Sequence, residues 1–174
     1  MIELARKFAE AAHQGQVRKY NGKPYFTHPE RVAKRLQELG YPPEMVAAGY
    51  LHDVVEDCGI KIEEIEAAFG PKVAELVSGL TNPSNGLKLS RAKRKQIDRE
   101  HLAAQGTFVK IIKLVDRIDN IKELEGADAD FKKLYLEETI LLIPCLYSEC
   151  GLDNPTYYNL MSQLGKLVIE MTGS

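Results

Sequence analysis

The sequence predicts an all-α protein, a bundle of about eight to nine helices that forms a single domain over residues 1–174. Apolar residues recur at three- and four-residue spacing along most of the chain, which is the period of one helix face. No segment shows convincing alternation of apolar and polar residues, the pattern of a half-buried strand. With 44% hydrophobic and 28% charged residues, the chain has the composition of one globular domain with a substantial core.

Glycine and proline separate the helices expected in the N-terminal half. The first has an apolar face from Leu4 to Ala12, and the second begins at THPER, where Thr27 and Glu30 have the spacing of a capping box. Gly40 and the two prolines that follow it stop the second helix. The third runs from these prolines through YLHDVVEDCG, and IEEIEAAFG and PKVAELVSGL are two further helices.

TNPSNG is the clearest loop and precedes the helices of the C-terminal half. A basic helix is expected over residues 90–104, followed by helices at FVKIIKLVDRIDNIKEL and DFKKLYLEETILLIPCLYSEC. We expect Pro144 to kink the second of these. A last helix is expected over residues 155–171.

Charge and cysteine content argue against several classes of protein. A formal net charge of −2 gives no overall attraction to nucleic acid or to a membrane surface. No apolar run approaches the roughly 20 residues that span a bilayer, and the amphipathic start MIELARKFAEAAHQG is unlike a signal peptide. Three cysteines without a CxxC pair fit a reduced protein better than a disulfide framework. We therefore expect a cytoplasmic protein that binds neither nucleic acid nor membranes.

The segment YLHDVVEDCG is unexpectedly polar for the apolar helix that carries it. One histidine and three acids stand within six residues: His52, Asp53, Glu56 and Asp57. Residues three and four apart on a helix are neighbours, and charged groups in an apolar setting are costly unless they are paired or bind a metal. The alternative is a solvated polar stripe at a helix end, but acids at a helix C-terminus oppose the helix dipole. The pattern favours a functional site.

Two other segments supply the same kinds of side chain. His28 in PYFTHPER is by itself most simply a polar cap at a helix start. Asp116 and Asn120 in KLVDRIDNI lie four residues apart, and a salt bridge from Asp116 to a lysine or arginine is the plain alternative. Taken together, two histidines and two aspartates are mixed ligands suited to manganese, iron or zinc. Such a set leaves positions open for water and a phosphate oxygen, and a carboxylate one turn away can move protons for that water.

In order along the chain these residues form the pattern H…HD…D, which resembles the HD superfamily of metal-dependent phosphohydrolases. The segments AAHQGQVRKYNGKPYFTHP, GYLHDVVED, FGPKVAELVSGLT and IIKLVDRIDNI resemble the hydrolase domain of RelA/SpoT proteins and their stand-alone small relatives over residues 5–140. The resemblance implies an HD domain whose metal ligands are His28, His52, Asp53 and Asp116. The expected ion is divalent, with manganese first and iron or zinc as alternatives.

The resemblance also implies roles for residues outside the ligand set. Glu56 and Asp57 match the pair that orients or deprotonates the attacking water. Arg18 and Lys19 match a dipeptide that meets the purine and the phosphates, and Asn120 matches an asparagine near the nucleoside. A planar guanidinium stacks on a base and binds phosphate through two nitrogens, which suits Arg18, although a solvated loop is the plain reading of that dipeptide alone.

Two residues depart from the RelA/SpoT pattern. Asp119 in DRIDN stands where these hydrolases commonly have histidine, and Glu123 stands where a small hydroxyl residue is usual near the sugar. An acid close to a polyphosphate repels it. The departures leave the metal ligands intact and bear on which nucleotide is bound.

A basic run from Lys88 to Arg99 contains six basic residues and one acid. Most of these side chains fit a solvated helix face, but in a slightly negative chain the run is the obvious local attractor of phosphate. Arg94 and Lys95 are the members expected to reach the substrate. Two residues of a later helix are weaker candidates for substrate binding: Lys132 and Tyr135. For Tyr135 the alternative is packing in the core.

The sequence therefore predicts a cytoplasmic, metal-dependent phosphohydrolase of a small nucleotide. The lead case is removal of the 3′-pyrophosphate from guanosine 3′,5′-bis(diphosphate), with no synthetase or regulatory domain expected after Ser174. One alternative is another nucleotide phosphoester as substrate. A second is an inactive, metal-bearing nucleotide sensor, against which the Glu56–Asp57 pair argues because a sensor needs no proton transfer. A nucleic-acid-binding function rests on the basic run alone, and a homo-oligomer is compatible with the sequence.

Overall fold

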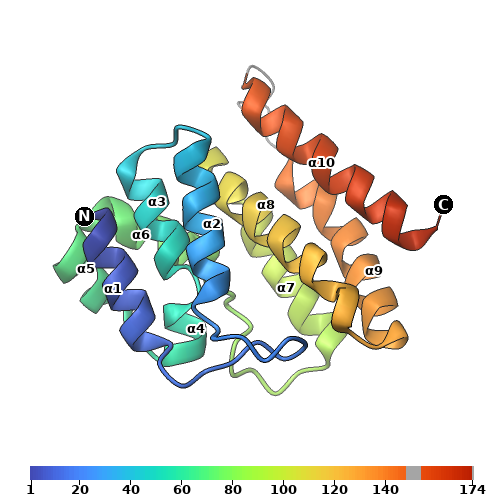
Figure 1. Cartoon of the computed structure of the whole chain (residues 1–174), viewed down its shortest axis with the longest axis horizontal. Coiled ribbons are helices and arrows are strands. Elements are labelled where there is room, and N and C mark those ends of the chain that lie inside the picture. The colour runs from blue at the N-terminus through green and yellow to red at the C-terminus, as the bar shows by residue number, and fades with distance from the viewer. Residues whose placement is uncertain (148–153, 174) are drawn as a thin grey trace. The chain divides into compact units, whose positions relative to one another are not determined.

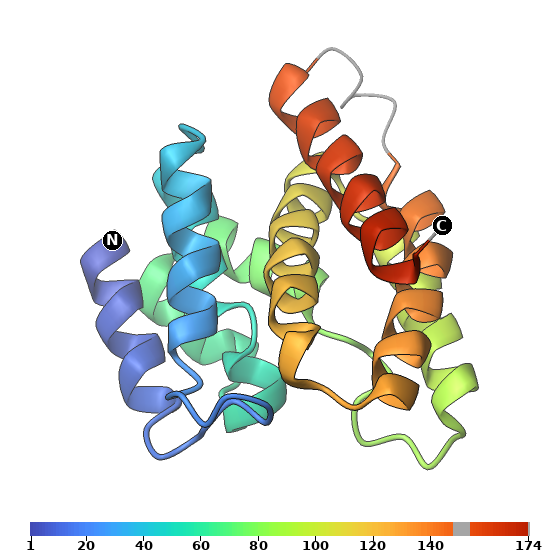
Figure 2. The same cartoon turned by 45° about the vertical axis from the view of Figure 1, so that its right-hand side comes forward.

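Helices make up the regular secondary structure of the computed structural model, which describes residues 1–147 and 154–173. Within those residues no strand is present, and extended pairing is confined to an isolated antiparallel bridge between Val17 and Pro24. The all-α prediction is confirmed (Figure 1, Figure 2). None of the described helices is long and apolar enough to cross a membrane.

The helices fall into two compact units, residues 1–82 and residues 83–174. Unit 1 contains α1 Ile2–Ala12, α2 Thr27–Glu38, α3 Pro43–Leu51, α4 Val54–Cys58, α5 Ile62–Phe69 and α6 Pro71–Leu80. Unit 2 contains α7 Arg91–Ala103, α8 Thr107–Lys122, the 3-10 helix η1 Glu123–Gly126, α9 Ala129–Leu146 and α10 Pro155–Thr172.

Helix α3 is the buried centre of unit 1. Every residue from 45 to 51 is buried, so the helix is enclosed on all sides and packs against α1, α2 and α6. Pro43 occupies its first turn, as the sequence predicts. Gly49 lets α2 approach closely, because a Cβ atom there would lie 2.8 Å from Leu36 Cδ1 and 3.1 Å from Ala33 Cα.

The helix predicted to run through YLHDVVEDCG is broken in the structure. Helix α3 ends at Leu51 and α4 begins at Val54, with Asp53 between them at φ −102° and ψ −7°. In an unbroken helix the carbonyl of Gly49 would accept the backbone N–H of residue 53. Here the ring Nδ1 of His52 lies 2.9 Å from that carbonyl. The ring of His52 thus takes part in ending α3, and the chain turns at the His–Asp pair.

The break also changes the setting of the two acids that follow. Glu56 and Asp57 lie in the first turn of α4 and not at the end of a long helix. The dipole argument against a solvated stripe therefore does not apply, because the N-terminal end of a helix is its positive end. Helix α4 ends at Cys58 and is followed by Gly59, whose φ of +70° is a left-handed conformation that glycine adopts without strain.

The start of α2 differs from the predicted capping box. Thr27 is the first helical residue, and no side chain caps the helix at Phe26. Thr27 Oγ1 instead donates to the carbonyl of Pro24 at 2.8 Å, which closes the turn before the helix. His28 follows in the first turn and is buried, so it is not a solvated polar cap.

A tight loop joins α1 to α2 and is held by backbone hydrogen bonds. The N–H of Arg18 donates to the carbonyl of Lys23 at 2.8 Å, and the N–H of Gly22 donates to the carbonyl of Arg18 at 3.0 Å. The N–H of Tyr25 donates to the carbonyl of Gln16 at 2.9 Å. These bonds fix Arg18 and Tyr25 on one short, hairpin-like segment.

In unit 2, α8 is the most buried element. It packs against α9 and α10, and α7 packs against α9. Ser90 caps α7, its hydroxyl accepting the N–H of Lys93 at 3.3 Å. Pro144 lies inside α9 near its C-terminal end. The final residues predicted for this helix, Cys150 among them, lie outside the described residues.

Replacing Gly49 with alanine should destabilise the protein by about 1–3 kcal/mol, the usual cost of overpacking a core. The end of the Leu36 side chain can move away from a new methyl group, but the backbone of Ala33 cannot. Gly165 in α10 is the matched control, because a Cβ atom there meets nothing within 4 Å. Gly165→Ala should stabilise by about 0.5–1 kcal/mol. Urea unfolding followed by circular dichroism measures both, and equal effects would contradict the close approach of α2 to α3.

Candidate metal centre

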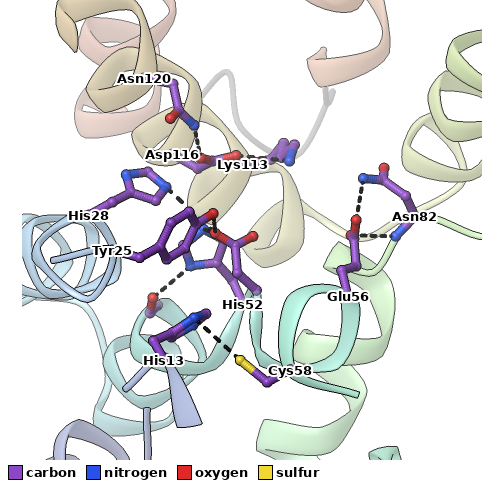
Figure 3. Close-up of polar contacts among 12 residues, drawn as sticks. His13, Tyr25, His28, His52, Glu56, Cys58, Asn82, Lys113, Asp116 and Asn120 are labelled. Atoms are coloured by element: carbon purple, nitrogen blue, oxygen red, sulfur yellow. Dashed lines mark hydrogen bonds and ion pairs between the residues drawn. The ribbon is translucent and has the colours of Figure 1, made fainter. Parts of the chain in front are cut away.

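Three predicted ligands meet in unit 1: His28, His52 and Asp53. One ligand atom of each lies within 4.8 Å of the others. Asp53 Oδ2 is 3.8 Å from His28 Nε2 and 3.1 Å from His52 Nε2. Both histidine side chains are buried, at 1% and 2% exposure, whereas that of Asp53 keeps 19% of its surface open. The first turn of α2 and the break between α3 and α4 bring these groups together (Figure 3).

The ring of His52 is oriented by the backbone. Its Nδ1 faces the carbonyl of Gly49, an acceptor, so Nδ1 carries the proton and Nε2 presents a lone pair in the neutral ring. That lone pair faces the Asp53 carboxylate at 3.1 Å. Two acceptors at this distance repel each other unless a proton or a cation lies between them. The donor set therefore fits a divalent ion held by both Nε2 atoms and Asp53 Oδ2.

Tyr25 supports the carboxylate from outside the ligand set. Its hydroxyl donates to Asp53 Oδ2 at 2.8 Å. Its ring lies against that of His13, with centroids 4.8 Å apart, and edge-on to that of His28 at 6.2 Å. Burial, and then the charges of Asp53 and Asp57, raise the pKa of Tyr25 far above its ordinary value. The phenol therefore stays protonated and remains a donor.

Glu56 is held by a residue that the sequence pattern does not indicate. The backbone N–H of Asn82 donates to Oε1 at 2.8 Å, and the side-chain Nδ2 donates to Oε2 at 3.0 Å (Figure 3). Asn82 follows the C-terminal cap of α6 and is 26 residues from Glu56, so no local periodicity reveals the contact. This Asn82 clamp fixes the plane of the carboxylate.

Asp57 is exposed as a residue, but its carboxyl group is partly removed from water. This loss of solvation, and then the charge of Asp53, raise the pKa of Asp57 above its ordinary value. A hydrogen bond from Tyr25 and the nearby His13 and His52 partly oppose the rise. A carboxyl group whose pKa moves towards neutrality is suited to donating a proton as well as accepting one.

A further buried histidine, His13, follows α1 at 2% exposure. Its Nδ1 lies 2.8 Å from Gln16 Oε1 and 3.3 Å from Cys58 Sγ. Gln16 Nε2 donates to the carbonyl of Asp57 at 3.1 Å, so this cluster ties the loop after α1 to the end of α4. Burial raises the pKa of the Cys58 thiol, which stays neutral. In the sequence, the only indication of this polar cluster is the grouping of a histidine and two glutamines in AAHQGQ.

In unit 2, Asp116 lies on α8 and is buried, at 4% exposure. Lys113 Nζ lies 2.8 Å from its Oδ2, and Asn120 Nδ2 donates to its Oδ1 at 2.5 Å (Figure 3). The lysine salt bridge raised as the plain alternative is therefore present, and the role of Asp116 as a ligand stays a prediction. Asp119 on α8 and Glu123 at the start of η1 are both half-buried.

The predicted substrate-binding residues of unit 1 lie in the loop after α1. The guanidinium of Arg18 lies over the ring of Tyr25, with Cζ 5.2 Å from the ring centroid. Lys19 Nζ lies at the same distance of 5.2 Å from the centroid of Tyr20. Arg18 is half-buried, so it is not the fully solvated loop residue that the dipeptide alone suggests.

Two predicted substrate-binding residues of unit 2 lie on α7. Arg94 Nη1 donates to the carbonyl of Leu89 at 2.7 Å, and Lys95 Nζ lies 3.8 Å from Asp98 Oδ2. Burial lowers the pKa of Lys95, although the charge of Asp98 opposes this shift. Both side chains are half-buried, in contrast to most of the basic run around them.

The other two candidates lie on α9. Lys132 Nζ donates to the carbonyl of Glu125 at 2.8 Å. The ring of Tyr135 lies beneath the guanidinium of Arg117, whose Cζ is 4.4 Å from the ring centroid. Arg117 is a buried cation that the sequence pattern does not single out, and its Nη1 also lies 3.4 Å from Thr139 Oγ1. Tyr135 thus packs against a charged group within unit 2.

The chain belongs to the HD domain family, whose match covers residues 5–142. It is 38% identical, over 83% of its length, to a Synechocystis protein named probable guanosine-3′,5′-bis(diphosphate) 3′-pyrophosphohydrolase. It is 36% identical, over 84% of its length, to a Vibrio cholerae protein named guanosine-3′,5′-bis(diphosphate) 3′-pyrophosphohydrolase. The aligned parts make up 19% and 21% of these relatives, so the chain spans about a fifth of their length.

Solved structures confirm the fold over almost the whole chain. A structure described as a metazoan ortholog of SpoT that hydrolyses ppGpp and plays a role in starvation responses matches with a TM-score of 0.83 and 27% identity. The match covers 99% of this chain and 95% of that one. A Listeria monocytogenes protein matches with a TM-score of 0.69 and 28% identity, over 90% of this chain and all of its own.

Asp53→Asn should abolish tight binding of a divalent ion, because it removes the charge on the oxygen that both histidines face. The loss should exceed the roughly 10–100-fold that removing an outer-shell partner of a metal site costs. Asp57→Asn is the matched control, since it makes the same change four residues later and should keep the metal. Elemental analysis after dialysis against manganese measures the content. A fully loaded Asp53→Asn protein would contradict the ligand assignment.

Proposed function

We propose that this chain is a metal-dependent hydrolase that removes pyrophosphate from the 3′ position of guanosine 3′,5′-bis(diphosphate). The observation that carries the proposal is the meeting of His28, His52 and Asp53, with the clamped Glu56 one helical turn after Asp53. Support comes from the relatives that are named for this activity and from the matching structure that is described as hydrolysing ppGpp.

We further infer that residues 1–174 act as one HD domain, because the family match runs through both units. In this proposal Asp116 is the fourth ligand, on the basis of the sequence pattern H…HD…D. The expected ion is manganese, with iron or zinc as alternatives that suit the same ligands. When bound, the ion supplies Lewis acidity, which makes a water more acidic and a phosphorus more electrophilic.

The reaction adds water to the phosphorus bonded to O3′ and breaks the bond between that phosphorus and O3′. The products are pyrophosphate and guanosine 5′-diphosphate, with a proton on the released O3′. Glu56 is proposed to accept the proton of the attacking water, and the Asn82 clamp holds its carboxylate in place before the reaction begins. Asp57, with its raised pKa, is proposed to supply the proton for O3′.

The substrate is proposed to meet the protein through its base and its phosphates separately. A guanidinium has two faces, and Arg18 places one on Tyr25, so the other is the face for the purine. Asn120 is proposed to lie near the nucleoside. The cations proposed to attract the phosphates are Lys19, Arg94, Lys95 and Lys132, and Tyr135 is a further proposed contact of the substrate.

We expect the protein to act in the cytoplasm on a small nucleotide, without nucleic-acid or membrane partners. Cys58 and Cys145 are free thiols, which fits a reducing compartment. A homo-oligomer is compatible with the proposal and plays no part in it.

A different nucleotide phosphoester is the second candidate substrate, and the observation that favours it is the pair of acids Asp119 and Glu123. Both are half-buried, where repulsion of a polyphosphate is less screened by water than at a free surface. An inactive nucleotide sensor is the third candidate. The clamped Glu56 speaks against it, because a sensor needs no oriented base.

A nucleotide panel tests the proposed function directly. The purified protein, supplied in turn with manganese, iron and zinc, should release pyrophosphate from guanosine 3′,5′-bis(diphosphate). Guanosine monophosphate, guanosine triphosphate and adenosine 3′,5′-bisphosphate serve as the other substrates. Turnover of these alone would replace the proposed substrate by another phosphoester. Binding without turnover of any of them would move the protein to the sensor class.

Glu56→Gln should lower kcat by about 10²–10⁴-fold, the usual contribution of a general base, while the protein stays folded and keeps its metal. Asn82 can turn its side-chain amide to accept from the new glutamine, so the clamp is retained. Glu63→Gln is the matched control, because Glu63 also lies in the first turn of a short helix. Steady-state kinetics and metal content are the measurements. A rate near that of the unmodified protein would move the role of base to another group.

A further inference from the structure

Tyr25 contacts two groups that the proposed function uses for different purposes. Its hydroxyl donates to Oδ2 of Asp53 at 2.8 Å, and this is the oxygen that both candidate histidine ligands face. Its ring carries the guanidinium of Arg18 at 5.2 Å. The hydroxyl and the ring face are separate parts of one side chain, so one residue joins a metal ligand to the proposed purine-binding arginine.

The position of Tyr25 is fixed from several directions. Its backbone N–H donates to the carbonyl of Gln16 at 2.9 Å, and the loop that carries Arg18 is closed by backbone bonds on the same segment. The ring lies 4.8 Å from the ring of the buried His13. The side chain of Tyr25 is planar and rigid, so its hydroxyl and its ring face keep a fixed geometry relative to Asp53 and Arg18.

We propose that Tyr25 is a positioning residue for two groups of the site, its hydroxyl holding the metal ligand Asp53 and its ring holding Arg18. The inference rests on the proposed function, because it takes Asp53 as a metal ligand and Arg18 as the contact of the purine. A carboxylate ligand that accepts an additional hydrogen bond is held in one orientation, and loss of such an outer partner weakens metal binding. The contact with an aromatic ring likewise holds the guanidinium of an arginine in one orientation, in which it can stack on a purine.

Two substitutions of Tyr25 separate these effects. Tyr25→Phe keeps the ring and removes the hydroxyl, so it should weaken manganese binding by about 10–100-fold and leave KM at saturating manganese unchanged. Tyr25→Leu removes both parts, so it should weaken manganese binding to the same degree and also raise KM by at least roughly 2-fold, because loss of a cation–π contact costs that much even at an exposed site. Arg18→Ala should raise KM without changing manganese affinity.

Tyr20→Phe is the matched control, because Tyr20 lies in the same loop and carries the same kind of contact, with Lys19. It should leave both manganese affinity and KM unchanged. The double substitution Arg18→Ala with Tyr25→Leu should have the KM of Arg18→Ala alone, because the ring acts on the nucleotide through the arginine. A general loss of structure would instead change every readout together in all of these variants.

Calorimetric titration of the metal-free protein with manganese, in the absence of nucleotide, decides the hydroxyl half of the proposal. A Tyr25→Phe protein that binds manganese within about twofold of the unmodified protein overturns it, because an outer partner is worth more than that. Equal KM values for Tyr25→Phe and Tyr25→Leu overturn the ring half. If no nucleotide is turned over at all, the proposed function and the ring half of the proposal both fail, while the titration still shows whether Tyr25 holds Asp53.

Discussion

The contact between the ring of His52 and the carbonyl of Gly49 is the interaction on which the metal centre depends. It fixes the proton on Nδ1 and so turns Nε2 towards Asp53. The contact also occurs where α3 ends. The candidate ligand that it orients, the ring of His52, therefore lies at the turn of the chain that positions the next candidate ligand, Asp53. Gly49 has a second role, because its missing side chain lets α2 approach α3 and bring His28 to the site.

Polar groups are costly to bury, and three in unit 1 have a hydrogen-bond partner from a different element. Tyr25 reaches Asp53 from the loop after α1, and Asn82 reaches Glu56 from the end of α6. Gln16 holds the carbonyl of Asp57 from the loop that follows α1. The two bonds from Asn82 fix the carboxylate of Glu56, whereas the bond from Gln16 fixes the backbone at Asp57.

The residue types of the site could be predicted from the sequence, and its supporting contacts could not. His52 and Asp53 stand out because polar groups in an apolar setting are costly unless they are paired or bind a metal, and His28 joins them only through the pattern H…HD…D. Helix positions follow from apolar spacing, with glycine and proline as boundaries. The break after Leu51 is invisible to that periodicity, because α3 is apolar on all sides and a side chain helps to end it. Asn82 and its partner are 26 residues apart, and local patterns carry no signal for contacts at that separation.

The most direct test of the metal centre is a crystal structure of the manganese-loaded protein with data collected at the manganese absorption edge. We expect an anomalous peak within bonding distance of Nε2 of His28, Nε2 of His52 and a carboxylate oxygen of Asp53. The Nδ1 of His52 should remain on the carbonyl of Gly49. A peak that lies away from these three side chains, or that is bound through Nδ1 of His52, would contradict the proposed centre.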